Sequence, residues 1–291
     1  MHRRLLTLAV AALAVATAGC VTIARPEGPA PLRYRDEVFT NVAKTADVTY
    51  GSAPDAQGTQ QSLELDVYRP QGDTVTNRPA IVWVHGGGFS GGDKTSPEIV
   101  DEATTFARKG YVTVSIEYRL RQPGCVGPAP PGWCAAAILD ARHDAQAAVR
   151  FLRANRGTYG VDSTRIGIGG SSAGAITALN VGFNPDDPGT SGNPGPSSAV
   201  QGAVSLSGGL LGGTAEKSDA PILLFHGTAD PLVPYGLATQ TIDLARAAGI
   251  PAFLITWQGE GHVPYAQHRQ QILDTTTNFL YSAMDLAHAA R

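Results

Sequence analysis

Gly170-Ser171-Ser172-Ala173-Gly174 lies between two stretches of different character, the apolar residues 165–169 before it and the helix-prone residues 175–179 after it. This order predicts a strand, a tight turn and a helix. Small residues two positions before and after Ser172 let strand and helix pack closely, while the serine sits on a strained turn with its oxygen exposed. Ser172 is therefore the predicted nucleophile, although the pentapeptide alone also fits an ordinary surface turn.

A second glycine-rich segment follows a short apolar strand predicted over residues 80–84. It reads His85-Gly86-Gly87-Gly88-Phe89. Glycines let the backbone curve until its N–H groups converge on one point, and such donors stabilise the oxyanion of an acyl-transfer transition state. Gly87 and Gly88 are the predicted donors, together with the N–H of Ala173. We expect His85 to brace the loop.

Two nucleotide-binding interpretations of these glycines fail when compared residue by residue. A phosphate-binding loop needs glycine, lysine and serine or threonine in succession, whereas Gly91-Gly92-Asp93-Lys94-Thr95 inserts an aspartate. A dinucleotide-binding fingerprint starting at Gly167 would need glycine at position 172, where this chain has serine. Neither glycine loop therefore predicts a nucleotide site.

Two further side chains follow the serine in the order acid, then histidine. Asp230 lies in a turn-rich loop after the apolar residues 221–225, and His262 follows the predicted strand 252–257. A histidine titrates near neutrality and can take the serine proton, while a carboxylate fixes its tautomer and stabilises the imidazolium. The order matches an α/β-hydrolase arrangement, so Asp230 and His262 are the predicted acid and general base.

Each of these two assignments has an alternative. Asp230 could simply form an Asx turn before Pro231, and His262 could be a solvent-exposed loop residue. Glu260 and Asp187 are alternative acids, but neither directly ends a predicted strand.

From about residue 60 to the C-terminus, the chain resembles α/β-hydrolase-fold carboxylesterases of the hormone-sensitive-lipase and feruloyl-esterase-like group. The resemblance rests on the loop from His85 to Phe89, Glu117-Tyr118-Arg119-Leu120, the pentapeptide around Ser172, the Asp230 loop and Gly261-His262. It implies an α/β-hydrolase fold and a serine carboxylesterase that works through an acyl-enzyme. Arg121-Gln122-Pro123 stands where the family usually has Ala-Pro-Glu. The resemblance therefore does not predict the pocket wall formed near these residues.

The distribution of apolar residues predicts a mostly parallel sheet with helices on both faces. Residues 62–68 alternate polar and apolar, as a half-exposed antiparallel edge strand should. Later strands are mostly apolar and alternate with helical segments, which is typical of a parallel sheet covered on both sides. These strands are predicted over residues 80–84, 111–118, 165–169, 200–207, 221–225 and 252–257. Residues 184–198 are rich in turn-forming residues and are expected to form an exposed loop beside the site.

The N-terminus has the pattern of a targeting segment. Arg3-Arg4 precedes the apolar residues 5–18, and the run ends in Thr17-Ala18-Gly19-Cys20, which resembles a bacterial lipoprotein signal. The predicted division is a signal peptide over 1–19, the lipidated Cys20 with a proline-rich tether over 20–33, and a single catalytic domain over 34–291. The product would be an exported membrane lipoprotein. Because Thr17 departs from the usual leucine, cleavage nearby to release a soluble secreted protein is the alternative.

The mature chain would otherwise contain only Cys125 and Cys134, which flank a proline- and glycine-rich loop. In an exported protein we expect them to pair, and closing a loop of this size stabilises a protein by roughly 2 to 3 kcal/mol in the chain-entropy model. Two free thiols are the alternative.

Composition limits the partners that the chain can have. A net charge of −3 and scattered Lys and Arg give no signal of nucleic-acid binding. A small ester substrate and a membrane, reached through the lipid anchor, are the expected partners, with no metal or organic cofactor; the oligomeric state is not predicted. Short acyl chains are expected, because residues 184–198 are polar and residues 122–134 proline-rich, so neither forms an apolar lid. An amidase or peptidase on the same fold, or a non-catalytic binding lipoprotein, are the alternatives.

Overall fold

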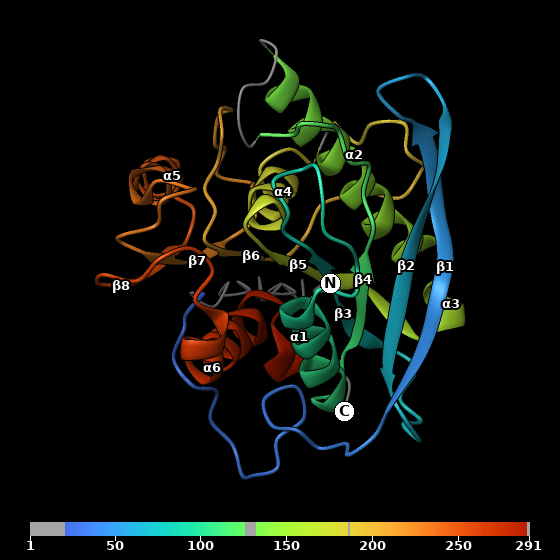
Figure 1. Cartoon of the computed structure of the whole chain (residues 1–291). Coiled ribbons are helices and arrows are strands. Elements are labelled where there is room, and N and C mark those ends of the chain that lie inside the picture. The colour runs from blue at the N-terminus through green and yellow to red at the C-terminus, as the bar shows by residue number, and fades with distance from the viewer. Residues whose placement is uncertain (1–20, 126–131, 186, 290–291) are drawn as a thin grey trace, which may run out of the picture.

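A computed structural model describes residues 21–125, 132–185 and 187–289. Within these residues an eight-stranded sheet has the order β1-β2-β4-β3-β5-β6-β7-β8 (Figure 1). The pairs β1–β2 and β2–β4 are antiparallel, and all later pairs are parallel. The strands are β1 Val42–Pro54, β2 Gln60–Pro70, β3 Arg78–Val84, β4 Val112–Ile116, β5 Val161–Ser171, β6 Ala203–Leu206, β7 Ile222–Gly227 and β8 Ala252–Trp257.

Helices cover both faces of the sheet, which confirms the predicted architecture. Helices α1 and α6 lie on one face, and α2, α4 and α5 lie on the other (Figure 1). Their bounds are α1 Pro97–Arg108, α2 Trp133–Ala154, α3 Arg156–Tyr159, α4 Ala173–Gly182, α5 Tyr235–Ala247, α6 Tyr265–Ala283 and the short 3-10 helix η1 Leu286–His288.

The alternation of side chains along β3 divides the core into two layers. Ile81 and Trp83 belong to the buried cluster that includes α1 and α6, while Val82 and Val84 belong to the cluster that includes α2, α4 and α5. All of β3 is buried, because it lies in the middle of the sheet and both of its faces are covered. The continuous apolar run of residues 80–84 follows from this position.

The loops that follow the parallel strands meet at one edge of the sheet. The segments after β3, β5, β7 and β8 all leave the sheet at its carboxyl edge, since these strands run parallel to one another. In open α/β sheets this edge is where ligands bind. The predicted triad residues Ser172, Asp230 and His262 and the predicted oxyanion donors Gly87, Gly88 and Ala173 lie in these segments or at their ends.

The edge strand of the sheet is not the predicted one. Residues 62–68 belong to β2, which pairs with β4 on one side, while β1 takes the edge position on the other. Most side chains of β1 are exposed on both faces of the strand, so its sequence shows neither an apolar run nor regular alternation and was not predicted as a strand.

The turn-rich segment 184–198 also differs from expectation. Its backbone carbonyls at Pro188, Gly192 and Asn193 accept hydrogen bonds from the buried Arg150 of α2. The N–H of Ser52 in β1 donates to the Ser191 carbonyl at 3.0 Å. Residues 187–198 therefore lie against α2 and β1 rather than beside the serine.

The predicted tether is packed onto the domain instead of extending from it. The N–H of Thr22 donates to Ser282 Oγ at 3.0 Å, and Asn278 Nδ2 donates to the carbonyl of Ile23 at 3.2 Å. Ile23 packs against the core cluster of α1 and α6, and Leu32 is buried within it. Apolar side chains among the prolines explain why this part of the tether prediction is wrong. The signal peptide 1–19 and Cys20 lie outside the described residues.

No helix in the described part of the chain has both the length and the apolar character that crossing a membrane requires.

A buried ion pair joins β4 to α2. Arg119, just after β4, donates from its backbone N–H to Asp144 Oδ2 and from its guanidinium to Oδ1, both at 2.8 Å. The Asp144 side chain is fully buried. The same guanidinium donates to the Pro54 carbonyl of β1 and to Ser191 Oγ, so one cation links three segments.

Replacement of Asp144 by alanine should lower the free energy of unfolding by about 3 kcal/mol, the lower end of the range for breaking a buried ion pair. Arg119 would lose its fully buried partner and keep only Asp140, whose Oδ1 lies 3.2 Å from Nη1. Urea unfolding followed by circular dichroism measures the change. Glu37→Ala, which breaks the exposed pair with Arg108, is the control and should change stability by no more than about 1 kcal/mol. Equal effects of the two variants would show that the buried pair has no special role.

Candidate active site

Ser172 lies at the turn between β5 and α4, where its backbone has φ 52° and ψ −115°. A non-glycine residue with this positive φ is strained by about 1 to 3 kcal/mol. The N–H of Ser172 donates to the Leu206 carbonyl of β6 at 2.9 Å, which helps to hold the turn. A Cβ on Gly174 would lie 2.0 Å from the carbonyl oxygen of Val84. Glycine at this position therefore allows α4 to start directly against the end of β3.

The structure brings the three predicted side chains of Ser172, His262 and Asp230 together. His262 Nε2 lies 2.8 Å from Ser172 Oγ, and His262 Nδ1 lies 2.7 Å from Asp230 Oδ2. A carboxylate only accepts hydrogen bonds, so Nδ1 carries a proton and Nε2 is free to accept the serine proton. Each residue follows a different parallel strand: β5, β8 and β7.

Asp230 uses its two carboxylate oxygens for different partners. Oδ1 accepts hydrogen bonds from the N–H groups of Leu232 and Val233 at 2.9 and 3.0 Å, while Oδ2 faces His262. The turn and the contact with histidine, which were alternatives in the sequence, occur together. Burial opposes the charge of Asp230, but the hydrogen bonds from His262, Val233 and Leu232 lower its pKa below the ordinary value. The carboxylate is therefore ionised at neutral pH.

The two alternative acids have other partners. Glu260 Oε1 lies 3.3 Å from His268 Nε2, and Asp187 pairs with Arg142 of α2.

A second histidine contacts Asp230 from the end of β7. His226 is fully buried, and its Nε2 lies 2.9 Å from the Val233 carbonyl and 3.3 Å from Asp230 Oδ2. Because both neighbours are acceptors, Nε2 carries a proton. His226 is not among the predicted site residues. Its position four residues before the predicted acid, at the end of an apolar strand, was the only available signal.

The glycine loop after β3 lines the same cavity as Ser172. Gly87, Gly88 and Ala173 all contribute to the cavity wall. Ala173 is the first residue of α4, and the first N–H groups of a helix have no partner within it. In the described part of the chain, no hydrogen bond uses the N–H groups of Gly87 or Gly88. These donors are therefore available to a ligand.

His85 lies beneath the loop, as expected. Its Nδ1 donates to the Gly86 carbonyl at 2.7 Å, and its ring stacks on Tyr118 with centroids 4.3 Å apart. The Tyr118 hydroxyl in turn donates to the His85 carbonyl at 3.1 Å. His85 is fully buried and acts as part of the support for the glycine loop.

The cavity at Ser172 has a volume of about 630 Å³ and a mostly apolar lining. Ile176, Leu211, Leu232 and Leu237 contribute apolar side chains from the α4, α5 and connecting segments. Glu98 brings a carboxylate to the wall, where it accepts a hydrogen bond from Ser171 Oγ at 2.9 Å. A cavity of this size and composition suits a small organic molecule.

The predicted pairing of Cys125 with Cys134 is present, and both half-cystines line this cavity. A second cavity of about 420 Å³ shares Cys134 and Leu211 with the first. Among the described residues, no group of three or more His, Cys, Asp or Glu side chains could hold a metal ion.

Two family models match adjacent parts of the chain. The model described as BD-FAE matches residues 65–204, and the model described as TAP-like protein matches residues 210–284.

Similar proteins include several esterases. Gut esterase 1 of Caenorhabditis briggsae is 29% identical over 169 residues, a match that covers 55% of this chain and 28% of that protein. The chain spans less than a third of the length of the curated relatives it matches first.

Solved structures of esterase 2 from Thermogutta terrifontis match most of the chain. The native form has a TM-score of 0.67 at 22% identity and covers 84% of this chain and 94% of that chain. The butyrate-bound form has a TM-score of 0.65 at 23% identity and covers 79% and 92%. Together with the strand order and helix placement, this likeness shows that the chain has the α/β-hydrolase fold.

Proposed function

We propose that this chain is a serine carboxylesterase that hydrolyses carboxylic esters through an acyl-enzyme on Ser172. The observation that carries the proposal is the hydrogen-bonded series from Asp230 through His262 to Ser172, which opens into an apolar cavity. The similarity to esterases, including gut esterase 1, supports the ester bond as the target.

Acylation begins when Ser172 Oγ attacks the ester carbonyl carbon. Its proton passes to His262 Nε2, 2.8 Å away, and the ionised Asp230 stabilises the imidazolium that forms. The negative charge that develops on the carbonyl oxygen is stabilised by the N–H groups of Gly87, Gly88 and Ala173. Fixed donors of this kind cost no reorganisation during the reaction.

The tetrahedral intermediate then collapses. His262 gives its proton to the alcohol oxygen, the carbon–oxygen bond breaks, and the acyl group remains on Ser172. Water repeats the sequence with His262 as base and releases the acid. In this scheme the strain at Ser172 is useful, because it exposes Oγ towards both the histidine and the cavity.

The cavity favours small acyl groups. Its wall includes the Cys125–Cys134 disulfide, and among the described residues that line it the exposed large apolar side chains are Leu211 and Leu232. A lipase that docks on an oil surface needs a broad apolar face. The butyrate-bound structure of the Thermogutta terrifontis esterase also supports a short acyl chain.

We further propose that Cys20 anchors the exported protein to a membrane by lipidation. Thr22 contacts Ser282 near the end of α6, whereas α6 starts at Tyr265, close to His262. At 1.5 Å per residue these two ends of α6 are roughly 25 Å apart. An anchor at Cys20 would therefore hold the domain by the end remote from Ser172 and leave the cavity open to soluble or cell-envelope esters.

Ser172→Ala should lower kcat for p-nitrophenyl acetate by about four to six orders of magnitude, and His262→Ala by nearly as much, because the members of the triad act as a unit. Ser163→Ala, at the opposite end of the same strand, is the matched control and should keep wild-type activity. Steady-state kinetics and labelling of Ser172 by an organophosphate provide the measurements. Near wild-type turnover of Ser172→Ala would refute the mechanism, and absence of labelling together with absence of turnover would favour a binding module.

Acetyl to butyryl esters of p-nitrophenol should have higher kcat/KM than decanoyl and palmitoyl esters, because a cavity of about 630 Å³ suits a small organic molecule. A panel of esters compared at equal concentrations measures the preference, with an anilide of the preferred acid as the test for amidase activity. A rate that rises steadily to long-chain triglycerides, with activation at an oil interface, would contradict the acyl preference.

Wild-type protein from the native host should fractionate with membranes and have an acylated cysteine at its N-terminus, whereas Cys20→Ala should be soluble. Each methylene of an acyl chain that is buried in the bilayer contributes about 0.8 kcal/mol to membrane binding, so several chains on Cys20 are enough for stable attachment. Mass spectrometry of the mature N-terminus provides the measurement. An unmodified N-terminus, or identical fractionation of the two proteins, would show that ordinary secretion occurs instead.

A further inference from the structure

The segment 121–125 runs along the back of the glycine loop and holds its carbonyl groups. The N–H of Arg121 donates to the Phe89 carbonyl at 2.8 Å, and the N–H of Cys125 donates to the Gly88 carbonyl at 2.9 Å. The Gln122 side chain donates to the Ser90 carbonyl. Three successive carbonyls of the loop are thus bound by one short segment.

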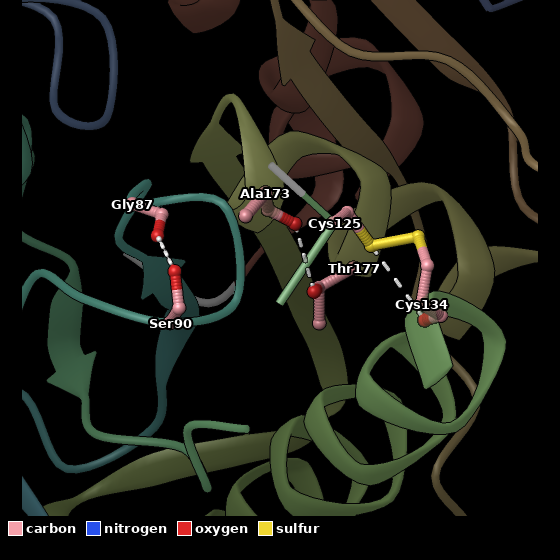
Figure 2. The surroundings of a disulfide bond; sticks show 6 residues. All are labelled: Gly87, Ser90, Cys125, Cys134, Ala173 and Thr177. Carbon is pink, nitrogen blue, oxygen red and sulfur yellow. Dashed lines mark hydrogen bonds between the residues drawn. A yellow bond between two sulfur atoms is a disulfide. The ribbon is translucent and has the colours of Figure 1, made fainter. Parts of the chain in front are cut away.

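Both ends of this segment are fixed to α2. At one end, the Arg121 guanidinium donates to Asp140 Oδ2 and lies over the ring of Trp133, 4.9 Å from its centroid. At the other end, Cys125 is bonded to Cys134 in the first turn of the helix. Figure 2 shows the disulfide between the start of α2 and the region that contains Gly87, Ser90 and Ala173. From Ala137 onward α2 has buried residues that belong to the same core cluster as those of the sheet and α4, so the helix ties the segment to the body of the domain.

We infer that segment 121–125, held by the Cys125–Cys134 disulfide, is the positioning element for the oxyanion donors of the glycine loop. The inference rests on the proposed ester hydrolysis. Gly88 has no side chain to pack, so its orientation depends on backbone hydrogen bonds. The bond from Cys125 fixes the Gly88 carbonyl, which belongs to the peptide plane next to the one that carries the Gly88 N–H, and so it limits rotation at Gly88. The plane of the Gly88 N–H itself is held within the loop, because its Gly87 carbonyl accepts hydrogen bonds from the N–H groups of Ser90 and Gly91 at 3.1 and 3.0 Å. Segment 121–125 in turn holds the Ser90 carbonyl. Donors stabilise an oxyanion only when they are held within about 0.5 Å of the productive geometry.

Two polar side chains make the remaining contacts of this segment. Arg121 and Gln122 are the side chains that tie it to α2 and to the loop.

Two glycines beside the disulfide form a matched pair for a test. Gly124 and Gly132 have similar positive φ values, +70° and +76°. A Cβ on Gly124 would lie 2.1 Å from the Gly88 carbonyl oxygen, whereas a Cβ on Gly132 would meet no described atom within 4 Å. Alanine at either position adds the same backbone strain, but only at Gly124 does it displace the glycine loop.

Gly124→Ala should lower kcat for p-nitrophenyl acetate by about tenfold to hundredfold with little change in KM, while Gly132→Ala stays near wild type. The second measurement compares p-nitrophenyl acetate with its thionoester. Sulfur is larger and a weaker acceptor than oxygen, so fixed donors shaped for oxygen discriminate against it. The rate ratio of ester to thionoester should fall in Gly124→Ala and in the double variant Cys125→Ala/Cys134→Ala. This ratio does not depend on the fraction of folded protein.

An unchanged ratio in both Gly124→Ala and the double cysteine variant, with Ser172→Ala still inactive, would overturn this inference and leave the proposed function intact. Equal losses in Gly124→Ala and Gly132→Ala with unchanged ratios would also overturn it, because strain alone would then explain the effect. Activity that persists in Ser172→Ala would instead show that the proposed function itself is wrong.

Discussion

The close approach of α4 to the end of β3 is the constraint on which the site depends. Gly174 lies so near the carbonyl of Val84 that a Cβ could not be accommodated. The approach puts the turn of Ser172 directly beside the loop that leaves β3, so the serine and the glycine loop share one cavity wall. Parallel pairing of β3 with β5 sets their relative height. The backbone strain at Ser172 persists because these contacts over-determine the turn.

A buried negative charge organises the opposite side of the cavity. The side chain of Asp230 is fully buried, and its oxygens are shared among His262, His226 and two backbone N–H groups. Burying a charge without such partners is costly, so the loop after β7 must take the shape that supplies them. The two histidines differ in exposure: His262 reaches the cavity, whereas His226 is enclosed. Only His262 is therefore able to exchange a proton with a ligand.

Much of the site could be predicted because its signals are local. The strands before Ser172, Asp230 and His262 are apolar runs that end in turn residues, and parallel strands bring their carboxyl ends to one edge. Strand β1 lacks such a signal, because most of its side chains are exposed and its place in the sheet comes from backbone pairing with β2. The packing of Ile23 depends on residues of α1 and α6, which are far from it in the sequence. The contact of His226 with Asp230 depends on how the loop after β7 folds back. No periodicity in the sequence reports such contacts.

The loop regions show why the sequence could predict the positions of Ser172, Asp230 and His262 better than the course of the neighbouring segments. The elbow and the acid and histidine loops are each set by a strand of the common sheet. Segment 121–125, in contrast, is tied to α2 by Asp140, Trp133 and Cys134, which all lie in the helix that follows it. Both half-cystines also form part of the cavity wall. The same covalent bond therefore supports the glycine loop and limits the space for a substrate, so changes in acyl preference and in rate are coupled at this position.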